Sequence, residues 1–179
     1  MPKLPYRLLE SKHIYKGHII DLVKDRFVLD AAPGKIITRE IVRHPGAVAI
    51  VPFADKKSII LLRQFRYSAQ GDLWEIPAGT IEKGEKPAVC ARRELEEETG
   101  FKASKWKFIT SFLPAPGICN EILTVYRAEG LKPGRKNLDH DEFLEHEVVP
   151  LKKALSMIRS GKIRDAKTIV GILWSVYLL

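Results

Sequence analysis

The sequence predicts an α/β or α+β fold, a sandwich in which mixed β-strands pack with a small number of helices. Segments rich in β-branched residues recur between residues 18 and 151, whereas helical spacing is limited to three stretches between residues 87 and 179. Strands and helices do not alternate strictly. A chain of 179 residues with 45% apolar content suits one domain with an appended arm.

Residues 1–44 are predicted to form this N-terminal arm. The segments "HIIDLVKDRFVL" and "KIITREIVR" are typical of strands, and "DAAPGK" between them is typical of a turn. We therefore expect an antiparallel β meander over residues 6–44. It holds little apolar material of its own, so we expect it to pack on the following domain, on a second subunit, or on both.

Residues 45–179 are predicted to form the main domain. Its expected strands cover residues 47–53, 58–67, 105–113, 121–131 and 146–151, and "LWEIPAG" (residues 73–79) is a further short strand ending in a Pro–Gly loop. One helix is expected from Pro87, a favourable first-turn residue, to Gly100, which is favourable just past a helix end. Two more helices are expected over residues 152–160 and from Asp165, a possible N-cap, onward.

Composition excludes several classes of protein. Two cysteines, Cys90 and Cys119, provide neither a disulfide framework nor a four-ligand zinc cluster, and they favour a reducing, cytoplasmic setting. The longest apolar stretch, "TIVGILWSVYLL", is too short to span a bilayer, and the N-terminus lacks the apolar core of a signal peptide, so no membrane association is expected. The formal charge of +8 would attract polyanions or phosphorylated metabolites. No pattern for specific nucleic-acid recognition accompanies this charge.

The acidic stretch "RRELEEETG" lies in the first predicted helix. At about 100° per residue, Glu94, Glu97 and Glu98 fall on one edge of the helix, whereas Glu96 points away and is expected to be ordinary surface. The core-facing arc is expected to contain Ala88, Ala91, Leu95 and Thr99. One interpretation is a solvent-facing helix with i,i+4 ion pairs such as Arg93–Glu97. The other is a site for a hard cation, Mg²⁺ or Mn²⁺, because three like charges beside a core are costly without one.

Fixed spacing around this helix favours the second interpretation. Starting at Gly79 and ending at Phe101, the pattern is Gly-x5-Glu-x7-Arg-Glu-aliphatic-x-Glu-Glu-x-Gly-hydrophobic. This is the Nudix box, so residues 45–179 resemble a Nudix hydrolase, an α/β/α sandwich with a mixed β-sheet. The resemblance implies metal binding by Glu94, Glu97, Glu98 and the carbonyl of Ala78. It also implies catalytic roles for Glu97 and for Arg93, which would orient it, and for Glu85 a role in bracing the loop or in assisting a metal.

Features outside the box resemble the ADP-ribose pyrophosphatase subfamily. Pro116 follows Phe101 by fifteen residues in "LPAPGICNE", although a plain turn would explain it equally well, and "LLRQFRY" and "WEIPAG" are similar too. The resemblance implies cleavage of ADP-ribose, or a related nucleoside-diphosphate sugar, to AMP and ribose 5-phosphate. It also implies a homodimer in which the arm is exchanged. The implied substrate contacts are Arg39, Glu40, Arg66, Ala115, Pro116, Gly117 and Glu121.

The acidic segment "NLDHDEFLEHE" resembles the loop that supplies further carboxylates in this subfamily. Glu142 matches best as general base and additional metal ligand. Where the subfamily usually has a second acid, this chain has His140, which is the alternative base because a histidine titrates near neutrality. The box leaves other substrates open, such as a GDP-sugar, a dinucleoside polyphosphate or a capped RNA. A non-catalytic module that binds nucleotides or nucleic acid is a further alternative.

Overall fold

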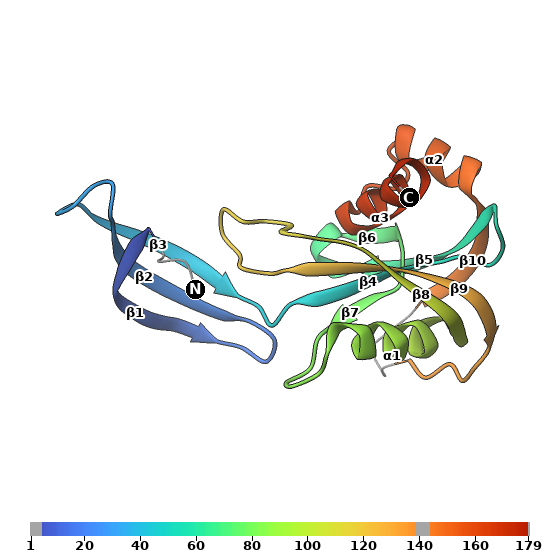
Figure 1. Ribbon diagram of the computed structural model, residues 1–179, viewed down its shortest axis with the longest axis horizontal. Coiled ribbons are helices and arrows are strands. Elements are labelled where there is room, and N and C mark those ends of the chain that lie inside the picture. Colours follow the sequence, from blue (N-terminus) through green and yellow to red (C-terminus); the bar gives the residue numbers. More distant parts are fainter. Residues whose placement is uncertain (1–4, 139–143, 179) are drawn as a thin grey trace. The chain divides into compact units, whose positions relative to one another are not determined.

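The computed structural model describes residues 5–138 and 144–178 of the chain (Figure 1). The chain divides into two compact units. The first contains Met1–Pro45 and Leu113–Glu121, and the second contains Gly46–Phe112 and Ile122–Leu179. Within the described ranges, no helix is both long and apolar enough to cross a membrane.

The first unit is built on a three-stranded antiparallel sheet. Its strands are β1 (Tyr6–Lys16), β2 (Asp21–Leu29) and β3 (Ile36–Arg43), in the order β1-β2-β3. The expected meander and the turn between β2 and β3 are thus confirmed. The segment of residues 113–121 lies along the free edge of β3, where the Val42 N–H donates to Ile118 O at 2.8 Å and the Asn120 N–H donates to Val42 O at 3.2 Å.

The second unit contains two sheets. The four-stranded sheet has the order β7-β4-β9-β8, in which β4 and β9 are parallel and the other pairs are antiparallel. The three-stranded sheet is antiparallel, in the order β10-β5-β6. The strands are β4 (Ala47–Pro52), β5 (Ser58–Arg66), β6 (Gly71–Glu75), β7 (Ala78–Thr80), β8 (Phe101–Phe112), β9 (Leu123–Pro133) and β10 (Leu144–Pro150). The mixed α+β class is confirmed.

Three helices complete this unit, and their ends follow from the sequence. They are α1 (Pro87–Thr99), α2 (Leu151–Arg159) and α3 (Ala166–Tyr177). Helix α1 has Pro87 in its first turn and ends at Gly100, whose φ of 75° is favourable for glycine and whose N–H donates to Glu96 O at 2.8 Å. Asp165 caps α3 as expected, because its side chain accepts from the Thr168 N–H.

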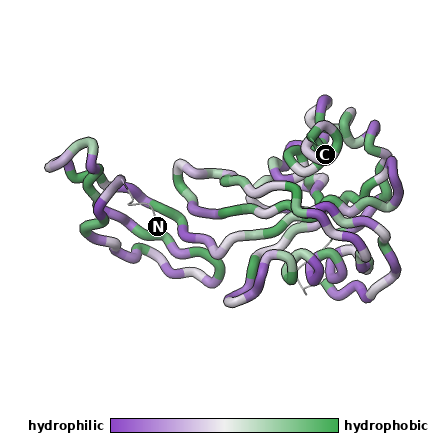
Figure 2. The backbone as a smooth tube through the Cα atoms, in the orientation of Figure 1, coloured by the Kyte–Doolittle hydropathy of each residue, from purple (hydrophilic) through white to green (hydrophobic). Residues whose placement is uncertain are grey.

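Strand β4 separates two apolar cores. Ala49 and Val51 belong to a core shared with α3 and the three-stranded sheet, whereas Val48 and Ile50 pack with residues of α1. This alternation is expected of a strand that is covered on both faces. Figure 1 shows α1 and α3 on opposite sides of β4, which gives the α/β/α layering, and Figure 2 shows hydrophilic and hydrophobic segments alternating along α1.

The buried face of α1 is rotated from the expected arc. Ala91, Leu95 and Thr99 are buried as expected, but Ala88 is exposed and Cys90 is fully buried. The reason is the position of β7, because the Cys90 thiol lies against that strand and donates to Thr80 O at 3.5 Å. The rotation carries Glu98 into the buried layer as well, where it is 2% exposed.

Candidate functional site

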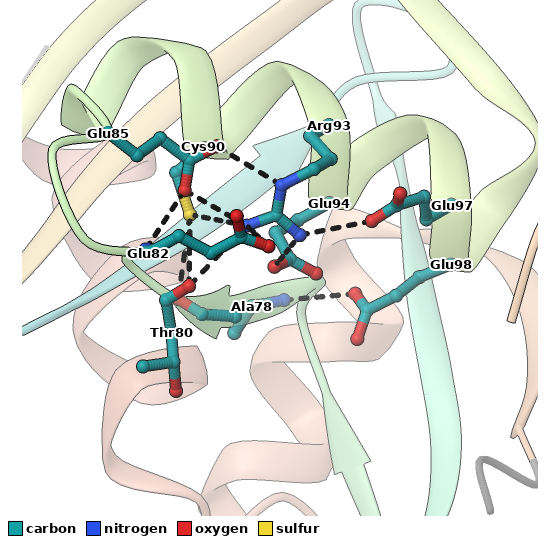
Figure 3. Close-up of polar contacts among 10 residues, drawn as sticks. Ala78, Thr80, Glu82, Glu85, Cys90, Arg93, Glu94, Glu97 and Glu98 are labelled. Atoms are coloured by element: carbon teal, nitrogen blue, oxygen red, sulfur yellow. Dashed lines mark hydrogen bonds and ion pairs between the residues drawn. The ribbon is translucent and has the colours of Figure 1, made fainter. Parts of the chain in front are cut away.

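Arg93 lies at the centre of a hydrogen-bond network on the acidic helix α1. Its Nε and Nη2 donate to the two oxygens of Glu85 at 3.1 and 3.0 Å, and its Nη1 donates to Glu94 at 2.6 Å and to Glu97 at 3.1 Å. Figure 3 shows the guanidinium between these side chains. The structure therefore contains the predicted contact between Arg93 and Glu97. It also shows that the same guanidinium bonds to Glu85 and Glu94.

Glu85 is a strongly perturbed carboxyl group of this network. The hydrogen bonds from Arg93, supported by the Glu82 N–H at 3.1 Å, lower the pKa of Glu85 to about 2. The same contact with Glu85 raises the pKa of Arg93. Glu85 thus ties the loop that precedes α1 to the helix through a pair that is charged at neutral pH, an arrangement suited to the first of the two roles expected for it.

Two further contacts join α1 to strand β7. The Ala78 N–H donates to Glu98 Oε2 at 3.0 Å, and Glu98 is turned toward this backbone in Figure 3. The carboxylate of Glu94 lies against Gly79, because a Cβ atom at residue 79 would stand 2.0 Å from it. Only glycine leaves this space, so the strand and the acidic helix edge approach closely here. The structure thus brings together Ala78, Arg93, Glu94, Glu97 and Glu98.

Oxygen donors dominate this cluster. Within residues 5–138 and 144–178, no group of three or more acidic, histidine or cysteine side chains is arranged to hold a metal ion as it stands. Arg93 lies between Glu94 and Glu97 and bonds to both. A hard divalent cation at these carboxylates would therefore exchange bonds with Arg93. The chemistry of the donors and the cradle at Gly79 fit such an ion.

A second charged network lies on β5, β6 and α3, and the sequence pattern assigned no role to two of its members. Glu75, 2% exposed, accepts from Nε and Nη2 of Arg66 at 3.0 and 2.8 Å and from Nζ of Lys167 at 2.6 Å. Burial opposes ionisation, but Arg66 and Lys167 outweigh it and lower the pKa of Glu75. Glu75 lies in the segment "WEIPAG" and Lys167 lies two residues after the N-cap Asp165, but the pairing of residues 92 positions apart leaves no trace in one sequence.

The other predicted substrate contacts belong to the first unit. Arg39 and Glu40 lie on the exposed strand β3, where Nη1 of Arg39 donates to Thr38 O at 2.8 Å. Ala115, Pro116 and Gly117 form an exposed turn that is closed by the Cys119 N–H on Ala115 O at 2.9 Å. At the end of this segment, Glu121 lies 3.7 Å from Nδ1 of His44.

The predicted bases, Glu142 and His140, lie outside the described residues. The chain that leads to them is attached to α1, since the Asn137 N–H donates to Glu97 O at 3.0 Å. The helix periodicity predicted that Glu96 is ordinary surface, and this prediction is wrong. Its Oε1 accepts from the Arg135 N–H at 3.1 Å and from Lys102 at 3.2 Å, because the chain following β9 passes over this side of the helix.

Comparisons with known proteins agree with one another. Residues 43–170 match the NUDIX domain. The chain is 43% identical over 175 residues to the ADP-ribose pyrophosphatase of Bacillus subtilis (strain 168), with 96% of this chain and 93% of that protein covered. It is 38% identical to the methanol dehydrogenase activator of Bacillus methanolicus, with 93% and 90% covered. In fold, it matches a crystal structure of an ADP compounds hydrolase with a TM-score of 0.80 at 20% identity, covering 96% of this chain and 92% of that one.

Proposed function

The chain belongs to the NUDIX domain family, and from this premise we propose that it hydrolyses the diphosphate bond of ADP-ribose or a related nucleoside-diphosphate sugar with a divalent cation. The observation that supports ADP-ribose as the substrate is the 43% identity, along almost the whole length of both chains, to a relative named ADP-ribose pyrophosphatase. The products would be AMP and ribose 5-phosphate. The two free cysteines support a reducing, cytoplasmic setting.

The cation would be Mg²⁺, with Mn²⁺ as the alternative. Its proposed ligands are Glu94, Glu97, Glu98, the carbonyl of Ala78 and, beyond the described residues, Glu142. When bound, such an ion supplies charge neutralisation at phosphorus and lowers the pKa of a water molecule. Oxygen-only donors and the buried position of Glu98 support this assignment.

Other residues of the helix edge would keep the carboxylates in place during turnover. Arg93 holds Glu94 and Glu97 through one nitrogen, Nη1, so the two carboxylates are oriented together. Glu85 fixes the opposite side of the same guanidinium. We propose that Arg93 and Glu97 act in catalysis through this arrangement, with Glu142 as general base and His140 as its alternative.

Proposed substrate contacts occur in each of the two units. Arginine forks suit diphosphate oxygens, which supports roles for Arg66 and Arg39. Glu40, Glu121 and the turn formed by residues 115–117 would contact the remaining parts of the nucleotide sugar. Kinetics can distinguish these binding roles from catalytic roles, because substitution of a binding residue should raise KM more than it lowers kcat.

We further propose a homodimer formed through the N-terminal arm, whose Arg39 and Glu40 would serve the partner's site. The support is the apolar surface of the first unit. The large apolar residues that are 42–61% exposed there are Tyr6, Leu8, Ile14, Tyr15, Ile19, Ile36 and Leu113. Such a surface is more typical of an interface than of a lone soluble sheet. Light scattering that gives the mass of a single chain at micromolar concentration would contradict this proposal.

The substrate is tested by incubating the purified chain with ADP-ribose, GDP-mannose, a dinucleoside polyphosphate and a capped RNA, each with Mg²⁺. We expect AMP and ribose 5-phosphate from ADP-ribose at the highest kcat/KM, and no turnover after chelation by EDTA. A higher kcat/KM for another substrate would reassign the specificity. Tight binding of RNA or DNA at physiological salt without hydrolysis of any nucleotide would overturn the enzymatic proposal.

A further inference from the structure

Arg66 is held by a carboxylate that is almost completely buried. The side chain of Glu75 is 3% exposed, whereas that of Arg66 is 38% exposed, so the pair reaches from the interior to the surface. Glu75 uses both oxygens on Arg66, a fork that fixes the plane of the guanidinium. An arginine bound in this way has one orientation in place of many rotamers.

Lys167 fixes Glu75 from the other side. Its Nζ donates to Oε2 of Glu75 at 2.6 Å and to Oδ1 of Asp165 at 3.1 Å. Asp165 caps α3, and its Oδ2 accepts from the N–H and the hydroxyl of Thr168. The first turn of α3 therefore anchors Glu75, and Thr168 extends the anchor by accepting from the Ile76 N–H at 2.8 Å.

The fork occupies only one side of the guanidinium. Nη1 of Arg66 donates to no acceptor in the part of the chain that the structure describes. The hydrogen bonds with Glu75 are the main cause of the raised pKa of Arg66, and the charge of Glu98 adds to it. Arg66 thus presents unused donors beside Glu75, which lies three residues before Ala78, whose N–H donates to Glu98 on the acidic helix edge.

We propose that Glu75 and Lys167 are positioning residues that hold Arg66 ready for an anionic oxygen of the substrate's diphosphate, an inference that rests on the proposed function. Neither residue touches the substrate. Glu75 sets the orientation of the guanidinium, and Lys167 keeps the Glu75 carboxylate ionised and in place. Preorganisation of this kind lowers the entropy lost on binding, so its removal weakens binding of substrate more than it slows chemistry.

The proposal is tested by a double-mutant cycle with Lys167→Met and Arg66→Ala. Methionine keeps most of the volume of the lysine stem but cannot bond to Glu75. In the wild-type background we expect Lys167→Met to raise the KM for ADP-ribose on the order of tenfold, with kcat within about twofold. In the Arg66→Ala background the same substitution should change KM by less than about twofold, because Lys167 acts through Arg66.

Two variants serve as controls. Lys167→Arg restores a cation beside Glu75 and should recover most of the wild-type KM. Lys153→Met breaks another Lys–Glu pair, in which the exposed Lys153 lies 3.1 Å from the exposed Glu147. This substitution should leave KM unchanged. An equal effect of Lys167→Met in both backgrounds, or none in the wild-type background, would overturn the proposal.

A second measurement separates this inference from the identity of the substrate. The Nε–Hε NMR signal of Arg66 can be followed in a titration with inorganic pyrophosphate. The signal should be sharp in the wild type and move on titration, and in Lys167→Met it should broaden and pyrophosphate should bind more weakly. If the wild type fails to hydrolyse ADP-ribose, the proposed function fails, yet this result still decides the role of Lys167. Unchanged line width and unchanged pyrophosphate affinity would overturn that role.

Discussion

The two charged networks of the second unit differ in their ratio of cations to carboxylates. Around Arg93, one guanidinium bonds to three carboxylates, Glu85, Glu94 and Glu97. Around Glu75, two cations, Arg66 and Lys167, are matched by two carboxylates, since Asp165 also pairs with Lys167. The first network carries excess negative charge, whereas the second is balanced.

This difference indicates what each network does. A partly buried group of carboxylates with too few cations is costly, and a divalent ion would offset that cost. A balanced network needs no further ion and is suited to holding its members in fixed positions. The comparison therefore supports the proposed cation binding at the edge of α1 and the proposed positioning role of the β5–β6–α3 network, and each proposal can be tested by a single substitution.

The largest effect is expected from Glu98→Gln, which removes one negative charge from the cation-poor network without changing its shape. Turnover of ADP-ribose should fall by about 10³-fold, because several kcal/mol of transition-state stabilisation depend on the bound ion. The fold should persist, since a glutamine oxygen can still accept from the Ala78 N–H. Steady-state release of AMP measures the first expectation, and thermal melting measures the second.

Magnesium provides a readout that is independent of activity. Mg²⁺ should raise the melting temperature of the wild type, because an ion that binds only the folded state stabilises it, but not that of Glu98→Gln. The matched control is Glu147→Gln, which neutralises a half-exposed carboxylate paired with Lys153 and should retain both responses. Wild-type turnover by Glu98→Gln at saturating Mg²⁺ would remove the metal assignment.

A smaller effect is expected from Glu85→Gln, measured as stability against pH. The folded-state pKa of Glu85 is about 2, below its usual value of 4.5, so its ionised form stabilises the fold at pH values above 4.5. At pH 7 the substitution should lower the free energy of unfolding by about 2 kcal/mol, as for a hydrogen bond to a charged group. Urea unfolding of both proteins between pH 7 and pH 2 is the measurement.

The sign of the pH dependence makes this test specific. The difference between wild type and Glu85→Gln should stay constant down to about pH 4.5 and shrink as the pH falls toward 2, because over that range the carboxylate takes up a proton in the unfolded chain but stays ionised in the folded one. A difference that does not change with pH would mean that Glu85 contributes through packing and not through its charge.

Much of the fold could be predicted because its signals are local. Pro87 and Gly100 bound α1, Asp165 caps α3, and runs of β-branched residues mark β4 and β5. The rotation of α1 toward Cys90 could not be predicted, since it depends on where β7 packs. The grouping of residues 113–121 with the first unit was hidden for the same reason, because it rests on hydrogen bonds to Val42 across the sheet edge.

In the candidate site, too, local features could be predicted from the sequence and contacts between distant segments could not. Glu94, Glu97 and Glu98 could be grouped from helical periodicity and box spacing, because they lie within one turn and a half of one helix. Glu75 and Lys167 could not, since hydrogen bonds that join β6 to α3 leave no periodic trace. Glu96 was assigned to solvent because periodicity describes a helix alone and not the chain that passes over it to bond with this carboxylate.

The smallest effect tests whether Asp165 belongs to the balanced network mainly as a cap or as a charge. Asp165→Asn keeps an oxygen for the Thr168 N–H but removes the charge beside Lys167, which still bonds to Glu75. We expect a loss of about 0.5 kcal/mol, typical of a partly exposed ion pair. Asp165→Ala removes the cap as well and should cost about 1 kcal/mol more. Chemical denaturation measures the free energy of unfolding of both variants. Equal losses for Asp165→Asn and Asp165→Ala would show that Asp165 contributes through its charge and not through capping. They would also show that Lys167 depends on both of its carboxylates.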